Sequence, residues 1–418
     1  MKYTEALYSL LFILLLSGCR SYNADSQNKN FEGNHLFPQH VDYSQASFIN
    51  QFSQSELDEH VTSFYDIWKN NYLIHAGQDK DNLDLYRIVT SKPGETTDRI
   101  TVSEGQGYGM ILSVLMAGHD PLAQKQFDGL WLYAKSNPSQ LNSAFMSWRI
   151  STAYPSGDSA FDGDADIAYA LLLADKQWGS DGPIDYLGQS VALINAIKLS
   201  VIDSFSHLPY LGDFQVRNPD KFLVRPSDFL LTNFRAYHAA TKDPFWLDVI
   251  QASLNVMQKT QSRYSEKTGL ISDFMDVNPV LSTYTPASGK VLESEYDGMF
   301  YYNACRVPMR IGLDALLTGN EKSSAIVKQI SQWISSSTNQ NPENIKAGYH
   351  LDGQPIAEGN YFTTVFAAPL GVAAMTVAGQ GNWLDSIYNE VYQLHESYFE
   401  DTINLLSMLI MSRNYWTY

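Results

Sequence analysis

The strongest constraint on the fold of this 418-residue chain is a helical hydrophobic pattern that recurs about a dozen times. Within each stretch the apolar residues lie three and four positions apart, which is the spacing of one face of an α-helix. No run of alternating strands separates the stretches. They are residues 53–68, 107–117, 121–136, 166–176, 187–200, 227–241, 244–263, 304–318, 323–336, 361–377, 382–394 and 402–413.

This pattern predicts an all-α fold. A chain of this length commonly holds two or three domains, but no segment rich in proline, glycine and serine divides the stretches, so we expect one domain. An even number of hairpin-connected helices fits an α/α toroid. A helical solenoid has the same periodicity, although no short sequence repeat supports it.

Residues 1–18 predict a bacterial lipoprotein signal peptide. A short charged start precedes an apolar run over 7–16, which is too short to span a bilayer as an ordinary helix. The small residues Ser17 and Gly18 then precede Cys19, an arrangement that resembles the lipobox, in which the cysteine receives the lipid. The alternative is a secretory signal that happens to contain a cysteine.

Residues 19–47 are rich in Asn, Gln, Ser and Asp and predict a flexible tether ahead of a single domain over 48–418. This organisation predicts a lipid-anchored protein of the bacterial cell envelope that faces outside the cytoplasm, or a secreted one. The lipid would be its only contact with a membrane, and we expect a monomer. If Cys19 is lipidated, Cys305 has no disulfide partner, because the chain has only two cysteines.

The charge of the chain argues against nucleic acid as a partner. Acidic residues number 45 and basic residues 28, which gives a formal net charge of −17 that repels phosphate backbones but is compatible with a cationic substrate. The 26 Tyr and 8 Trp suit sugar-stacking surfaces as well as a large core. The nine His and two Cys form no cluster at ligand spacing, so we expect no metal and no cofactor.

Glu104 is the first candidate for catalysis. It lies in V-S-E-G-Q-G-Y-G-M (102–110), whose glycines let the backbone approach a ligand closely, just ahead of the helix expected from Gly107. The carboxylate either interacts with the helix N-terminus or serves as a general acid at the rim of a pocket. Met110 stands where a dinucleotide-binding G-x-G-x-x-G motif requires glycine, and the pattern predicts no strand before it, so we do not expect that motif.

Alternating aspartates over 162–166 form the second candidate. They resemble the start of a calcium-binding EF-hand loop, but Ile167 and Leu173 stand where that loop requires Gly and Glu, so calcium is not expected. The aspartates either cap the helix that follows or bind a ligand. Together with Glu104 they suggest acid–base chemistry on a neutral polymer, as in glycoside hydrolysis.

These segments resemble glycoside hydrolase family 8. The stretch A-F-D-G-D-A-D-I-A-Y-A-L-L-L-A-D-K-Q-W (160–178) is similar to the family signature and departs from it mainly at Phe161, where a small hydroxyl residue is typical. The resemblance covers essentially the whole chain after the tether and implies an (α/α)6 barrel, inverting hydrolysis of β-1,4-linked glycans and an open cleft for endo-action. The further similar segments are 101–110, 127–131, 146–148, 225–229, 268–274 and 302–310.

The resemblance implies a role for each matching residue. Glu104 falls on the general acid, and Asp162 on the aspartate that holds the distorted sugar beside the scissile bond. Asp228 either pairs with an arginine or lines the cleft. The remaining substrate-binding candidates are the aromatic platforms Tyr108, Trp131, Trp148 and Tyr302, each of which is equally compatible with a place in the core, together with Asn303 and Arg306.

Asn303 is the informative departure. Family members that act as cellulases and xylanases have an aspartate there, the general base that activates water, and an amide cannot accept that proton. The chain therefore resembles the chitosanase and lichenase-type branch, in which a glutamate of an upstream loop is the base. We favour Glu293, with Glu295 as the alternative, at roughly 6.5–9.5 Å from Glu104 so that a water fits between them.

The substrate is less constrained. Because a charge of −17 attracts a polycation, we predict a chitosanase first and a β-glucanase, either cellulase or lichenase, second. If Asn303 instead marks lost catalysis, the chain is a lipid-anchored glycan-binding protein or an accessory of polysaccharide synthesis.

Overall fold

The computed structural model describes residues 33–96, 98–154, 157–217 and 222–418. The predicted signal peptide and Cys19 lie outside the described residues. Within the described part of the chain, no helix combines the length and the apolar character needed to cross a membrane.

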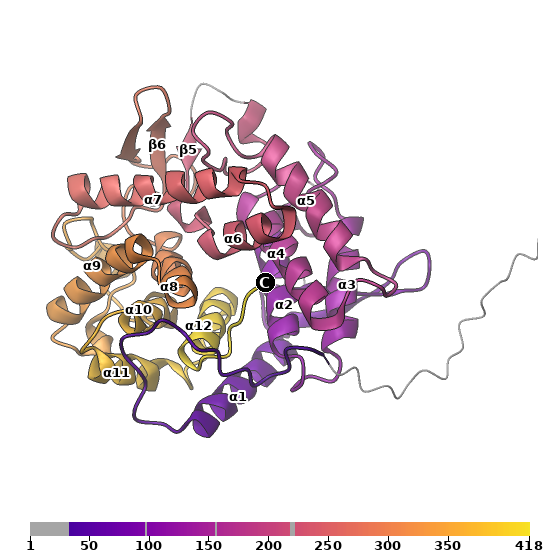
Figure 1. The fold of residues 1–418 in the computed structure, drawn as a ribbon, viewed down its shortest axis with the longest axis horizontal. Coiled ribbons are helices and arrows are strands. Elements are labelled where there is room, and N and C mark those ends of the chain that lie inside the picture. The colour runs from indigo at the N-terminus through magenta and orange to yellow at the C-terminus, as the bar shows by residue number, and fades with distance from the viewer. Residues whose placement is uncertain (1–32, 97, 155–156, 218–221) are drawn as a thin grey trace, which may run out of the picture. The chain divides into compact units, whose positions relative to one another are not determined.

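Twelve α-helices in the described residues form two concentric rings, which confirms the all-α prediction and the (α/α)6 barrel (Figure 1). The even-numbered helices follow one another around the inner ring, and each odd-numbered helix packs outside an inner neighbour. The inner helices are α2 (Ser103–Leu115), α4 (Phe161–Trp178), α6 (Leu231–Thr241), α8 (Val307–Thr318), α10 (Thr364–Met375) and α12 (Tyr398–Met411). The outer helices are α1 (Gln54–Tyr72), α3 (Ala123–Ser136), α5 (Tyr186–Ser200), α7 (Phe245–Tyr264), α9 (Glu321–Ser337) and α11 (Gly381–Val391).

The sequence of each helix explains its ring. Every residue of α10 is buried, as expected for a helix surrounded by others on all sides. Helix α1 instead buries one stripe, which includes Leu57, Val61, Phe64 and Trp68, and begins with a capping box at Ser53. A β-carbon on Gly105 would lie 2.3 Å from the Tyr398 hydroxyl, so α2 can approach α12 this closely only because the residue is glycine.

The first turns of α2 and α4 begin earlier than the hydrophobic pattern predicts. Helix α2 starts at Ser103 and α4 at Phe161, so Glu104 and Asp162 lie inside helices and not in the loops before them. The apolar spacing does not predict these first turns, because they are buried on several sides and consist partly of polar residues and glycine. Gly163 permits the contact between them, since a β-carbon there would lie 2.2 Å from the Ser103 hydroxyl.

Three small antiparallel sheets lie in the connections between helices. The first pairs β1 (Leu73–Gln78) with β2 (Asp84–Ile88), and the second pairs β3 (Thr101–Val102) with β4 (Arg149–Ile150). The third has the order β5 (Leu223–Val224), β6 (Met275–Asn278), β7 (Thr283–Pro286). Strand β3 leads directly into Glu104, β5 into Arg225, and β7 into the loop that carries Glu293.

Residues 33–47 are not a tether, which corrects the predicted boundary at 47. The backbone N–H groups of Phe37, Val41, Ser44 and Ala46 donate to carbonyl groups at or just beyond the C-terminal ends of α2, α12, α8 and α10, at 2.6–2.8 Å. Carbonyl groups at a helix C-terminus have no partner within the helix, so the segment supplies donors where they are needed. This packing could not be predicted from amino-acid composition, because backbone groups make the contacts. The segment lies at the end of α2 opposite to Glu104.

Candidate active site

The candidate catalytic residues converge where the inner helices begin. Glu104 lies in the first turn of α2 and Asp162 in the first turn of α4, while Arg225 immediately precedes the short helix before α6. Asn303 and Arg306 belong to the turn that leads into α8. The fold therefore unites residues that are about 200 positions apart in the sequence.

Arg306 is the centre of this cluster, although its side chain is only 1% exposed. Its Nη1 donates to Glu104 Oε2 at 2.6 Å and to Asp162 Oδ2 at 3.1 Å. Its Nη2 donates to Asn303 Oδ1 at 2.8 Å and to the Ser227 hydroxyl at 3.1 Å. One buried guanidinium thus fixes the predicted acid, the predicted sugar-holding aspartate and Asn303 relative to one another.

Arg225 is the second arginine that contacts Asp162. Its Nη2 lies 3.0 Å from Asp162 Oδ1, and its Nε donates to Asp228 Oδ1 at 2.9 Å. Asp228 therefore pairs with an arginine, which decides between the two roles considered for it. Burial raises the pKa of Asp228 to about 6, against the opposing effect of Arg225.

Glu104 and Asp162 share Arg306 but have opposite acidities. Burial raises the pKa of Glu104 to about 7; Arg306 opposes this effect and the charge of Asp162 reinforces it. Burial also raises the pKa of Asp162, but Arg225 and Arg306 outweigh it and hold that pKa well below its usual range. At neutral pH the site therefore combines a carboxyl group able to give up a proton with a carboxylate that stays charged.

Asn303 connects this cluster to Glu293. The Asn303 Nδ2 donates to Glu293 Oε2 at 2.8 Å, while its Oδ1 accepts from Arg306. Glu293 Oε1 lies 4.0 Å from Arg225 Nη1, and the Glu293 side chain is 47% exposed. The Glu295 carboxylate is exposed and has no hydrogen bond or ion pair with the described residues. The structure thus brings Glu293, and not Glu295, into contact with the site.

Asp273 is a site residue that the sequence reasoning missed. Its carboxylate accepts the backbone N–H groups of Tyr301, Asn303 and Ala304 at 2.9, 3.1 and 2.7 Å. Burial raises its pKa to about 7, although these N–H donors lower it. The signal in the sequence is its place in T-G-L-I-S-D-F (268–274), one of the segments that carry the family resemblance, where it is the single charged residue.

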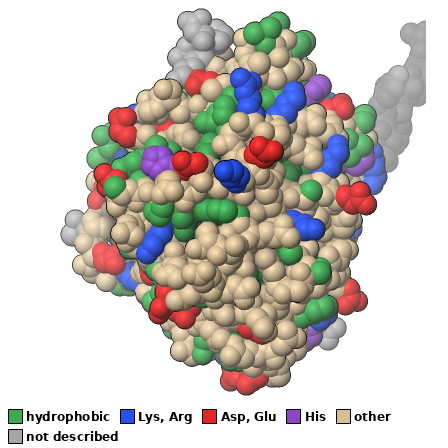
Figure 2. All heavy atoms as spheres, turned by 90° about the vertical axis from the view of Figure 1, so that its left-hand side faces the viewer, with side chains coloured by type: hydrophobic (Ala, Val, Ile, Leu, Met, Phe, Trp, Pro, Cys, Tyr) green, Lys and Arg blue, Asp and Glu red, His purple; other side chains and the backbone are tan. Residues whose placement is uncertain are grey.

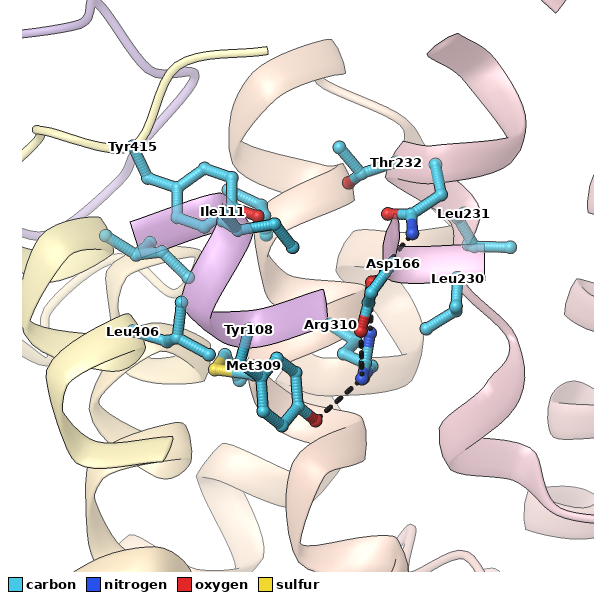
Figure 3. A pocket seen from close by; sticks show the side chains of 13 residues that line it. Tyr108, Ile111, Asp166, Leu230, Leu231, Thr232, Met309, Arg310, Leu406 and Tyr415 are labelled. Carbon is cyan, nitrogen blue, oxygen red and sulfur yellow. Dashed lines mark hydrogen bonds and ion pairs between the residues drawn. The ribbon is translucent and has the colours of Figure 1, made fainter. Parts of the chain in front are cut away.

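The predicted roles of Tyr108 and Trp131 as stacking platforms are wrong. Tyr108 is 1% exposed and points into the barrel interior, where its hydroxyl accepts from Arg310 Nη2 at 2.8 Å (Figure 3). Trp131 lies on outer helix α3, is 8% exposed and packs beneath Lys135. Neither ring presents a free face to a sugar, because helix packing covers it.

The other two aromatic predictions remain compatible with the structure. Trp148 is 42% exposed, and its carbonyl accepts from the backbone N–H of Ser103, the residue before Glu104. Tyr302 is half-buried, and its hydroxyl lies 2.7 Å from that of Tyr361. Both residues adjoin parts of the site, so their roles as sugar platforms stay predictions.

The aspartates after Asp162 do not cap a helix, so that alternative is wrong. Asp164 Oδ1 accepts from the backbone N–H of Met146 at 2.8 Å. Asp166 pairs with Arg310 at 3.0 Å and accepts from Asn233, and it lines the interior pocket of Figure 3.

Among the described residues, no group of three or more His, Cys, Asp and Glu side chains is arranged to hold a metal ion.

Comparisons with known proteins by sequence and by structure point to one family. The family model described as Glycosyl hydrolases family 8 matches residues 44–413. The chain is 42% identical over 390 residues to a beta-glucanase of Niallia circulans, covering 92% of each protein. It is 40% identical over 391 residues to an endoglucanase of Bacillus sp. (strain KSM-330), covering 91% of this chain and 81% of the relative. The apo structure of the beta-1,3-1,4-glucanase from Paenibacillus sp. X4 superposes with a TM-score of 0.86 at 42% identity, covering 92% of this chain and all of the other.

Proposed function

The chain belongs to glycoside hydrolase family 8 and is an endo-glycanase, and we propose that it cleaves β-glucans by an inverting mechanism, with mixed-linkage β-1,3-1,4-glucan as the preferred substrate. The names of its relatives support a glucan: a beta-glucanase, an endoglucanase and a beta-1,3-1,4-glucanase. Chitosan, which we placed first from net charge, has no support among these relatives, and the β-glucanase alternative fits them better.

The observation that carries the proposal is the contrast between Glu104 and Glu293. The Glu104 side chain is largely buried, at 19% exposed, and its pKa is raised to about 7, so at neutral pH a large fraction of it is protonated and able to protonate the leaving glycosidic oxygen. Glu293 is half-exposed, so its carboxylate is accessible to a water molecule. Such an acid and base on opposite faces of a sugar perform inverting hydrolysis.

The residues around this pair have supporting roles in the proposed reaction. Asp162 keeps its charge beside Arg225 and Arg306 and, as an acceptor, would bind a hydroxyl of the sugar next to the scissile bond. Asn303 donates to Glu293 and so leaves the second carboxylate oxygen of Glu293 to accept the proton of the attacking water. The amide therefore orients a base that it cannot itself replace.

The charges of the site favour a neutral glucan over chitosan. Asp162 and Asp228 are both paired with buried arginines, so neither offers a free carboxylate to a glucosamine ammonium group. On the face shown in Figure 2, acidic and basic side chains are interspersed and form no continuous acidic surface. On this face, therefore, the net charge of −17 does not gather into an acidic surface that would attract a polycation.

A substrate panel tests this proposal. Purified protein is incubated with lichenan, carboxymethylcellulose, xylan and chitosan, with Glu104→Gln as the matched inactive control, and reducing ends are counted. We expect the fastest release from lichenan, and NMR should detect the α-anomer as the first product. Faster release from chitosan, or a β-anomer formed first, would overturn the proposal.

We also propose that the protein is anchored to the bacterial envelope through a lipid on Cys19, as the lipobox-like sequence before it predicts. Cells that express the chain should incorporate labelled palmitate into it, and Cys19→Ser should abolish the incorporation. Equal labelling of both proteins would contradict the anchor.

A further inference from the structure

The loop that carries Glu293 is organised around one buried carboxylate, that of Asp297. Four consecutive backbone N–H groups, those of residues 291–294, all donate to it. Oδ2 accepts from Val291, Leu292 and Glu293 at 2.9, 2.7 and 3.1 Å, and Oδ1 accepts from Ser294 at 2.8 Å. Asp297 is only 1% exposed, so water does not compete for these contacts.

The base of the loop is fixed as well. A β-carbon on Gly298 would lie 2.0 Å from the carbonyl oxygen of Ala287, so the two ends of the loop touch backbone to backbone. The Asp297 carbonyl accepts from Phe274 N–H at 2.8 Å, and Phe274 follows Asp273, which holds the turn of Asn303. The Asp297 side chain therefore has a fixed position relative to Asn303.

We infer that Asp297 is a positioning residue for the general base Glu293. The inference rests on the proposed function, in which Glu293 activates water. The carboxylate of Asp297 holds the backbone N–H of Glu293 itself, and Asn303 holds the side-chain end of Glu293. These two contacts hold the half-exposed Glu293 side chain in one orientation. Without them, a side chain on a solvent-exposed loop would sample several rotamers.

Asp297 acts on the rate and not on substrate binding. A displacement of about 1 Å at a reacting group lowers a rate by up to about 100-fold. In Asp297→Asn, an NH2 group replaces one oxygen and faces backbone N–H donors, so the loop cannot keep its shape. We expect kcat to fall 10- to 100-fold while KM for lichenan stays within about twofold.

The experiment compares Asp297→Asn with a matched control, Asp120→Asn. Asp120 is also a buried carboxylate that accepts a backbone N–H, from Leu122, but it lies beyond the opposite end of α2 from Glu104. We expect the control to lose stability and keep the wild-type kcat. Asp297→Glu retains the charge but is one methylene longer, and its kcat should lie between those of wild type and Asp297→Asn.

Adding azide distinguishes a misplaced general base from a general loss of structure in the Asp297→Asn variant. Azide attacks the anomeric carbon as the C1–O bond breaks, Glu104 gives its proton to the leaving oxygen, and an α-glycosyl azide forms. Because this attack needs no base, azide should restore turnover in Asp297→Asn and in Glu293→Ala, and should not affect Asp120→Asn.

Each outcome bears on the inference. The role of Asp297 would be overturned if Asp297→Asn kept the kcat of the unmodified protein, or if its kcat fell and azide did not restore it. In either case the proposed function stands as long as the unmodified protein is active. An inactive wild type would overturn both. If Asp297→Asn does not fold, Asp297→Glu is used instead, and an unchanged kcat in that variant overturns the inference.

Discussion

The acid side and the base side of the site are built in different ways. The Glu104 side chain is 19% exposed and begins an inner helix, where a buried arginine contacts it directly. The Glu293 side chain is 47% exposed and lies on a loop, which backbone N–H groups and an amide hold in place. The difference follows from the chemistry, because the acid needs a raised pKa and hence burial, whereas the base needs access to water.

Two aspartates give the base side the rigidity that helix packing gives the acid side. Asp273 collects the N–H groups of the turn that carries Asn303, and Asp297 collects those of the loop that carries Glu293. Carboxylates that accept several backbone N–H groups can replace regular secondary structure locally. The comparison predicts that the acid side tolerates substitution less well than the base side.

The largest effect is expected for Glu104→Gln. The amide cannot protonate the leaving oxygen, so kcat on lichenan should fall by about 10³-fold, while the side chain keeps nearly the same volume. Reducing-end release measures kcat, and circular dichroism checks the fold. Retention of more than a few per cent of the activity would show that another group is the acid.

Glu293→Gln should have the next largest effect, a fall in kcat of about 10²-fold. Glu295→Gln is its matched control on the same loop and should stay within about twofold of wild type, because the Glu295 carboxylate does not contact the site. Of these two variants, azide should rescue only Glu293→Gln. The assignment of the base would be reversed if Glu295→Gln proved the more damaged variant.

The pH profile of the wild type tests the acid directly. The pKa of Glu104 is raised to about 7, and the protonated form is the active one, so activity is present below that pH and lost as pH rises through it. Above pH 7, kcat/KM on lichenan should fall about tenfold per pH unit. An alkaline limb that begins near pH 5 would contradict the effect of burial on Glu104.

Asn303→Asp should have the smallest effect and acts on the base side alone. The new carboxylate would replace the N–H donor to Glu293 with an acceptor of like charge, so Glu293 would lose the contact that orients its side chain. We expect kcat on lichenan to fall by about fivefold only, because the backbone contact between Glu293 and Asp297 still holds the loop. An unchanged kcat would argue against an interaction between Asn303 and Glu293.

Much of this architecture could be predicted from the sequence. The three- and four-residue spacing of apolar positions predicts the twelve helices of the described residues, and the family resemblance around Asn303 implies a base from the 293–295 loop. The positions of Tyr108 and Trp131 could not be predicted, since an aromatic side chain has the same sequence signal in a core as in a cleft. The packing of residues 33–47 was also missed, because backbone hydrogen bonds leave no mark on composition.

The sequence by itself determined the helices through local periodicity, and its contiguous motifs determined the family, from which the barrel and the proposal of Glu104 as the acid follow. Only the tertiary structure decided which loop glutamate meets Asn303, which aspartates pair with Arg225 and Arg306, and that Asp273 and Asp297 hold the base side. Those contacts join residues from helix starts and loops far apart in the chain. The pKa values of the carboxyl groups in the site depend on burial and on neighbouring charges, and both exist only once the barrel has folded.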